Sequence, residues 1–295
     1  NGIVPAMLLS SLSALAASWW YARKVRVRAV EFSWHDVVCE AGALFSLGAA
    51  FLITGLQAPV VQNALRMTLV RFGDLHTLGQ FLAAYALSHT YVNFVLDAMG
   101  LDYLPRLAQK KDNPDEMNRL INEQTILALM LAIPGITAFV TLAPMLIPLL
   151  YSARFDQAID VFRWQCLGVL LKVASWSMGY VLIAQSRRTA FVLTESVTNL
   201  FYVTPFYLLV RAAGLTGAAL SFAVVYLWYL PLMLVTVRRY TGFRGSSGAR
   251  HALIAALSAY TLALAVNHYL VGQWRWGGGA VLVTGTVAWS YRQLL

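Results

Sequence analysis

The feature that most constrains this chain is a succession of apolar segments, each about the length that crosses a bilayer. A membrane-spanning helix needs about 20 mostly apolar residues, and about nine such segments follow one another here. They are expected at 3–22, 41–61, 78–99, 124–142, 160–184, 190–210, 215–237, 252–271 and 280–291, with a turn at 272–279 before the ninth. Lipid offers no hydrogen-bond partner to the backbone, so each segment must be helical. The sequence therefore predicts an all-α, polytopic transmembrane helical bundle.

Composition and charge agree with a membrane protein. Charged residues make up 12% of the chain and hydrophobic residues 59%, whereas soluble domains contain about 25% charged residues. Lysine and arginine concentrate in alternate loops, as in Arg23–Arg28, Arg187–Arg188 and Arg238–Arg239. The positive-inside rule places these loops and the C-terminus in the cytoplasm. The net charge of +9 is thereby explained by topology, and no nucleic-acid partner is expected.

Polar residues form one face of each of the two segments that flank the turn at 185–189. In the first segment they are Gln165, Gly168, Lys172, Ser175 and Gly179, and in the second they are Glu195, Thr198, Asn199 and Tyr202. Steps of three and four residues put each set on one side of a helix. A charged side chain at bilayer depth costs roughly 2.5–3.5 kcal/mol, so it normally faces a protein interior or a wet cavity. We expect both faces to line a shared polar interior; a structural ion pair or polar packing between helices is the alternative.

Further ionisable residues are candidates for binding or coupling. The segment 78–99 carries His89, Thr90, Asn93 and Asp97 on a common side. With Glu195, the acid Asp97 and the imidazole of His89 are candidates for carrying protons or a coupling cation. Arg66 lies toward the outer face and can meet phosphate groups. The alternatives are that Arg66 is a solvated loop residue, that Asp97 caps or pairs at the cytoplasmic end, and that His89 is a satisfied interior histidine.

Signs of catalysis are missing from the sequence. It contains no G-x-S-x-G, H-E-x-x-H or C-x-x-C pattern, and its five histidines show no ligand spacing. Cys39 and Cys166 are expected near opposite faces, so no disulfide is predicted between them. We therefore predict no catalytic residue, no metal and no cofactor, and favour transport over an enzyme.

Three stretches resemble a known family. They are YVNFVLDAMGLDYLPRLAQ, IPGITAFVTLAPMLIPLLYSARFDQA and LGVLLKVASWSMGYVLIAQSRRTAFVLTESVTN. Their proline positions, the "G-Y-hydrophobic-L-hydrophobic-A" pattern and the "E-x-x-x-N" pattern resemble polysaccharide or O-antigen flippases of the multidrug/oligosaccharidyl-lipid/polysaccharide exporter superfamily. The likeness runs from about 78 to 240.

The resemblance implies an architecture of two helix bundles that face a central cavity. Residues 1–40 would be the last span of a first bundle with an interfacial linker, 41–240 the second bundle, and 241–295 a terminal helix pair. The chain starts with Asn1 rather than Met, which fits a C-terminal portion whose upstream spans are missing.

The resemblance also implies a function. Family members are thought to move lipid-pyrophosphate-linked oligosaccharides across the bacterial inner membrane by alternating access, for O-antigen, capsule or exopolysaccharide assembly. Lys172 would then face the sugar-pyrophosphate. The cavity candidates to bind substrate are Lys172, Gln165, Ser175, Asn199, Tyr202 and Arg66.

The expected partners are the lipid-linked substrate and membrane lipids, with glycan polymerase machinery as a further candidate. The alternatives within the superfamily are a cation-coupled multidrug exporter and a lipid II flippase. A membrane-bound glycan-modifying enzyme is the alternative from another class, and it would need catalytic residues in outer loops.

Overall fold

The computed structural model describes residues 3–24, 34–270 and 272–294, and these residues form an all-α bundle. The helices are α1 (Ile3–Ala22), α2 (Trp34–Phe72), α3 (Leu75–Gln109), α4 (Pro114–Leu150), α5 (Gln157–Ala184), α6 (Arg188–Thr241), α7 (Ser247–Tyr269) and α8 (Gln273–Leu294), with a 3-10 turn, η1 (Ala153–Phe155), before α5. The predicted fold class is confirmed. Within the described ranges, α4, α5, α6 and α7 are long and apolar enough to cross a membrane. The other expected spans stay predictions.

The chain divides into two compact units, Asn1–Gly48 and Ala49–Leu295. In the first unit, α1 ends in aromatic residues whose rings make cation–π contacts with the basic residues that follow. The Arg23 guanidinium lies 3.6 Å from the centre of the Trp19 ring, and the Lys24 ammonium lies 3.5 Å from that of Trp20. Such aromatic and basic residues are typical of a membrane–water interface. Part of the predicted interfacial linker, 25–33, lies outside the described residues.

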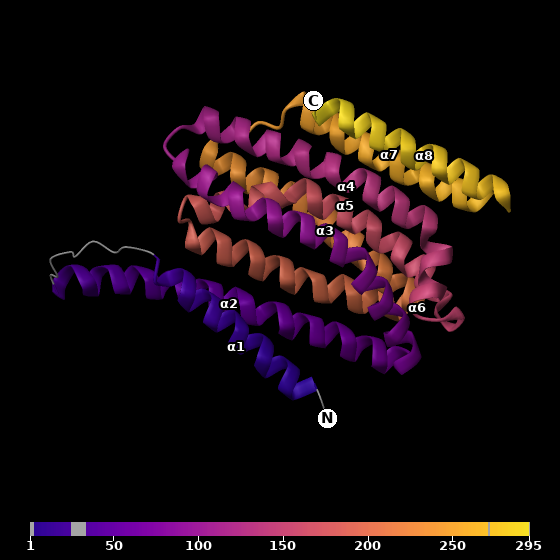
Figure 1. Ribbon diagram of the computed structural model, residues 1–295, viewed down its shortest axis with the longest axis horizontal. Coiled ribbons are helices and arrows are strands. Elements are labelled where there is room, and N and C mark those ends of the chain that lie inside the picture. Colours follow the sequence, from indigo (N-terminus) through magenta and orange to yellow (C-terminus); the bar gives the residue numbers. More distant parts are fainter. Residues whose placement is uncertain (1–2, 25–33, 271, 295) are drawn as a thin grey trace. The chain divides into compact units, whose positions relative to one another are not determined.

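In the second unit, α5 is the central helix and packs against α3, α4 and α6, while α7 and α8 pack against α4 (Figure 1). Small residues permit the close approach of α5 to α6. A Cβ atom on Gly168 would lie only 3.0 Å from the backbone nitrogen of Ala223 and would also meet the ring of Phe222. Membrane helices use small residues in this way, because association there depends on close packing.

The two apolar segments at 190–210 and 215–237 belong to one long element, α6, which is broken in the middle. Ala213 (φ −136°, ψ 16°) and Gly214 (φ 56°, ψ −130°) leave helical values. A positive φ favours glycine, which has no Cβ to clash with the backbone. The break therefore turns the second half of α6 back against the first.

One predicted boundary differs from the structure. The stretch 272–279 was expected to be a turn, but α8 already begins at Gln273. The glycines instead allow close contact with neighbouring helices. A Cβ on Gly279 would collide with Thr141 of α4, and one on Gly278 would lie 2.8 Å from Leu270.

Helix ends in the second unit carry polar caps. The Asp74 carboxylate begins α3 by accepting hydrogen bonds from the backbone nitrogen and the hydroxyl of Thr77, each 2.7 Å long. These bonds favour the charged form and hold the pKa of Asp74 below its usual value. Asn113 caps α4, and Ser246 caps α7.

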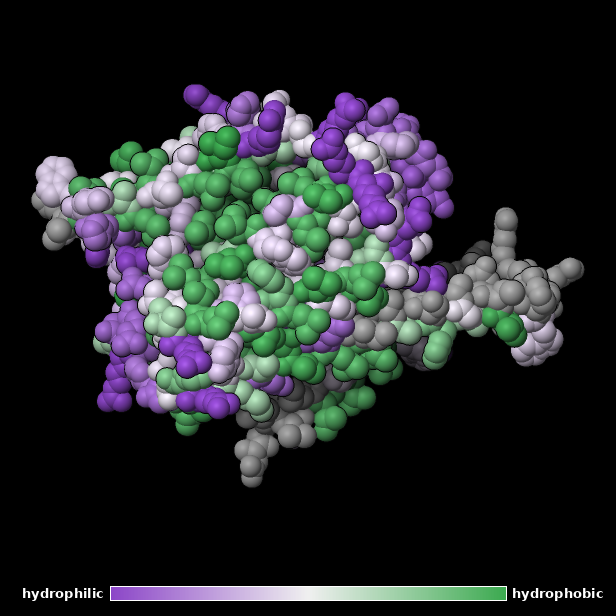
Figure 2. All heavy atoms as spheres, turned by 180° about the vertical axis from the view of Figure 1, so that it is seen from behind, coloured by the Kyte–Doolittle hydropathy of each residue, from purple (hydrophilic) through white to green (hydrophobic). Residues whose placement is uncertain are grey.

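The surface separates apolar from polar side chains. On the face shown in Figure 2, hydrophobic side chains gather over the middle, and hydrophilic ones gather toward the left and upper right edges. Many large apolar residues are exposed, among them Phe94, Leu200 and Leu227. Broad exposed apolar area is expected where lipid replaces water as the solvent.

Candidate functional site

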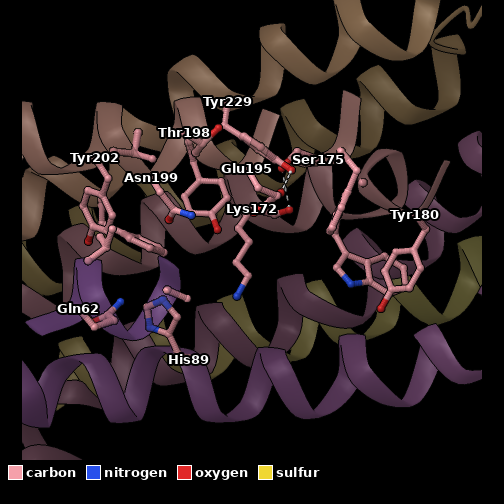
Figure 3. A pocket seen from close by; sticks show the side chains of 18 of the residues that line it. Gln62, His89, Lys172, Ser175, Tyr180, Glu195, Thr198, Asn199, Tyr202 and Tyr229 are labelled. Carbon is pink, nitrogen blue, oxygen red and sulfur yellow. Dashed lines mark hydrogen bonds between the residues drawn. The ribbon is translucent and has the colours of Figure 1, made fainter. Parts of the chain in front are cut away.

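A cavity of about 440 Å³ lies in the second unit, bounded by α2, α3, α5 and α6. This volume is in the range of about 300–1,000 Å³ that is usual for ligand pockets. Six of the predicted site residues line it: His89, Lys172, Ser175, Glu195, Asn199 and Tyr202. The two polar helix faces thus border one interior, as Figure 3 shows.

Lys172 supplies the positive charge of this cavity. Its side chain extends from α5 toward α3 (Figure 3), where the ammonium donates a 2.7 Å hydrogen bond to Oδ1 of Asn93. Asp97, one turn further along α3, is close enough to interact electrostatically with the ammonium. Asn93 is neutral, and an ammonium has three donors. The bond to Asn93 therefore orients the charge without neutralising it.

Glu195 supplies the negative charge. Its Oε1 accepts a 3.2 Å hydrogen bond from the hydroxyl of Tyr229. Both residues belong to α6, on opposite sides of the break at Gly214, so the break brings them together. Among the described side chains, no ion pair joins Lys172 to Glu195. The two charges face one cavity and each is held by a neutral partner.

His89 brings an unpartnered ring nitrogen to the cavity. Its Nδ1 lies 3.0 Å from the backbone oxygen of Tyr85 and 2.9 Å from the hydroxyl of Ser88. The ring stacks on that of Tyr85, with 3.9 Å between the ring centres. Nε2 is buried and has no hydrogen-bond partner. A ligand hydroxyl, which can both donate and accept, suits this nitrogen in either tautomer.

Three predicted site residues are not among those that line the cavity. Gln165 is fully buried, and its Oε1 accepts a 3.0 Å hydrogen bond from Ser88 of α3. It lies two turns before Lys172, where α5 is packed against α3. Arg66 and Asp97 are both exposed. Arg66 lies within α2 rather than in a loop, close enough to Tyr85 of the cavity wall to interact with it electrostatically.

Most of the aromatic wall of the cavity was not predicted from the sequence. Tyr85, Trp176, Tyr180, Tyr226 and Tyr229 also line the cavity. Aromatic residues in an apolar segment carry no local signal that distinguishes a cavity wall from a lipid-facing surface. Tyr229 in particular is 34 positions from its partner Glu195.

Neither a metal centre nor a disulfide emerges from the described residues. None of their histidine, cysteine and acidic side chains form a group of three that could hold a metal ion. Cys166 is buried and free. The side chain of Cys39 lies outside the described ones.

Comparison with known proteins identifies the family. Residues 2–160 match the family model described as "Polysaccharide biosynthesis protein", which is more than half of the chain. The chain belongs to this family. The resemblance to polysaccharide flippases of the exporter superfamily is thereby confirmed. This family member is also 26% identical over 192 residues to the lipid III flippases of Escherichia coli (strain K12) and Shigella flexneri. The matched region covers 65% of this chain and 46% of each relative, so the chain spans about half their length.

A solved structure shares the fold. The inward closed conformation of the lipid II flippase MurJ superposes with a TM-score of 0.55 at 13% sequence identity. The match covers 90% of this chain and 57% of that protein. The helical arrangement of this family member therefore resembles that of this solved structure.

Proposed function

We propose that this chain forms part of a transporter that flips lipid-pyrophosphate-linked oligosaccharides across the bacterial inner membrane, for O-antigen, capsule or exopolysaccharide assembly. Membership in the polysaccharide biosynthesis family supports the class of substrate. The two named relatives are lipid III flippases, so lipid III itself belongs among the candidate substrates. In this proposal 41–240 is the second bundle, 241–295 a terminal helix pair, and the C-terminus is cytoplasmic.

The observation that carries the proposal is the ammonium of Lys172, which faces a cavity between helices and bonds a neutral partner. A pyrophosphate carries the opposite charge and accepts hydrogen bonds, which are strongest when both groups are ionised. The cavity adds Asn199, Ser175 and the Nε2 of His89, which are suited to sugar hydroxyls. Cation and polar wall together match a headgroup that joins phosphate to sugar.

Glu195 is proposed to couple transport to a cation gradient. Its carboxyl lies in the same cavity as Lys172 and holds a single hydrogen bond from Tyr229. Intramembrane acids in transporters commonly bind protons or cations. Because no ion pair with Lys172 is present among the described side chains, the carboxyl can bind and release a proton or cation without breaking such a pair.

The test of substrate binding is a rescue assay. The complete gene is expressed in a flippase-deficient bacterium, and surface glycan is measured together with lipid-linked intermediates. At equal membrane abundance, Lys172→Ala should lose rescue, and Lys172→Arg should keep part of it, because the charge is retained. Lys111→Ala is the matched control, since Lys111 is an exposed loop lysine. Equal activity of the Lys172→Ala and Lys172→Arg variants would sink this role for Lys172.

The test of coupling uses Glu195→Gln, which keeps the shape and removes the ionisation. Transport by this variant should depend less on the proton gradient than transport by the wild type. Glu123→Gln is the control, because Glu123 is exposed and pairs with Arg119 at the surface. An unchanged dependence in Glu195→Gln would remove the coupling role.

A further inference from the structure

A second cavity, of about 410 Å³, lies between the beginning of α5 and the end of α7. It is lined by Asp160, Arg163 and Trp164 of α5 and by Tyr260, Leu264, Ala265, Asn267, His268 and Tyr269 of α7. It shares no lining residue with the Lys172 cavity. The proposed function does not use it.

Arg163 brings an unused donor to this cavity. One terminal nitrogen of its guanidinium pairs with Oδ1 of Asp160 at 2.9 Å, and its backbone oxygen accepts a 2.7 Å hydrogen bond from the hydroxyl of Tyr260. The Arg163 side chain is only 23% exposed, whereas that of Asp160 is 73% exposed. The Nε of Arg163 is buried and has no hydrogen-bond partner. A guanidinium whose Nε–H has no partner is suited to donate to a phosphate oxygen.

Asn267 brings an unused acceptor. Its Nδ2 donates to the backbone oxygens of Val140, at 3.2 Å, and Ala263, at 2.9 Å. Both partners can only accept, so the orientation of the amide is determined. Its Oδ1 is left buried without a partner. Because buried polar groups are nearly always hydrogen-bonded, an unmet donor and an unmet acceptor in one cavity point to a ligand that has both functions.

The rim of the cavity indicates where this ligand comes from. Trp164 and Tyr269 are exposed there. Tryptophan and tyrosine concentrate at the level of lipid headgroups, where their rings are apolar on one side and wet on the other. A headgroup that enters from the membrane would meet the aromatic rim and the exposed Asp160 first, with the less exposed Arg163 behind them.

We propose that this cavity binds the headgroup of an amine-bearing phospholipid of the phosphoethanolamine type. Its phosphate accepts hydrogen bonds from Arg163, and its ammonium donates to Asn267 Oδ1 and to the Asp160 carboxylate. A choline headgroup has no N–H to donate, and a glycerol headgroup has no positive charge for Asp160. The paired charges of the cavity therefore select ethanolamine over both.

The experiment measures lipid affinity by native mass spectrometry on the full-length protein, purified in detergent and delipidated. The probes are dihexanoyl phospholipids with ethanolamine, glycerol or choline headgroups, together with free phosphoethanolamine. The wild type should bind the ethanolamine lipid about tenfold more tightly than the choline lipid, which corresponds to about one charged hydrogen bond. Arg163→Gln should weaken binding of all three lipids about tenfold through the lost phosphate contact.

Two further variants separate the contacts. Asp160→Asn should keep phosphate binding and remove the preference for ethanolamine; since Asp160 is exposed, this variant decides the case even if Arg163→Gln does not fold. Arg154→Gln is the charge-matched control, because Arg154 is exposed in the turn before α5, and it should bind as the wild type does.

Four results would overturn the proposal. The first is equal affinity of the wild type for all headgroups. The second is an ethanolamine preference that Asp160→Asn leaves intact. The third is a folded Arg163→Gln that binds like Arg154→Gln. The fourth is free phosphoethanolamine that binds as tightly as the lipid, which would replace the membrane source with a soluble one.

Discussion

The hydrogen bond between Lys172 and Asn93 should make a measurable contribution to stability, because it joins a charged donor to an acceptor on another helix. Replacing Asn93 with Leu removes the acceptor at similar volume and leaves a partly buried ammonium without it. Replacing Lys172 with Met removes the charge. In the double variant the unpaired ammonium is gone, so the two changes should not add.

The size of the coupling free energy follows from the geometry. Interhelical hydrogen bonds in membrane proteins average about 0.6 kcal/mol and reach about 1.7 kcal/mol. Bonds to charged groups contribute about 1.5–3 kcal/mol in proteins generally. The Lys172–Asn93 distance of 2.7 Å is short, as charge-assisted bonds are. We therefore expect a coupling of about 1–2 kcal/mol, at the upper end of the membrane range.

The assay is a double-mutant cycle of the wild type, Asn93→Leu, Lys172→Met and the double variant, by equilibrium unfolding in SDS. Tyr91→Phe is the neutral comparison, because its hydroxyl donates a 3.1 Å bond to the backbone oxygen of Leu131 between α3 and α4. It should cost about 0.6 kcal/mol. If the Asn93 and Lys172 changes add within about 0.3 kcal/mol, which is the usual range for independent sites, the bond contributes nothing and the reasoning is refuted.

Two other predictions concern helix packing and orientation. Gly168→Leu should destabilise the protein by about 1–3 kcal/mol through overpacking against Phe222. Gly179→Ala should be tolerated, because the nearest atom to a Cβ at this position is 3.8 Å away. Equal melting temperatures of the two variants would contradict the close contact of α5 with α6. In a background without the native cysteines, an impermeant maleimide added to intact cells should label Arg154→Cys, and should label Arg239→Cys only after the inner membrane is opened. The reverse pattern would invert the proposed orientation.

Much of the helical architecture could be predicted from the sequence, because the signals are local. Each expected apolar segment falls in a described helix, except that 252–271 extends two residues past the end of α7 at Tyr269. The polar faces around Lys172 and Glu195 were also visible, since a spacing of three and four residues places side chains together on any helix. The prediction of a turn at 272–279 was wrong because of packing between helices. Glycines that usually end a helix serve there to pack α8 against α4.

The sequence by itself determined the all-α class, the apolar segments and the polar side of each segment in the Lys172 hairpin. Helical periodicity and the cost of burying charge in lipid act over a few residues, so both can be recognised from the sequence alone. Only the tertiary structure decided that Lys172 contacts Asn93, 79 positions away, and that Glu195 contacts Tyr229. It also decided that Gln165 is buried against Ser88 of α3 instead of lining the cavity. Those contacts depend on how helices pack and on the break at Gly214, and short-range periodicity carries no information about partners on other helices.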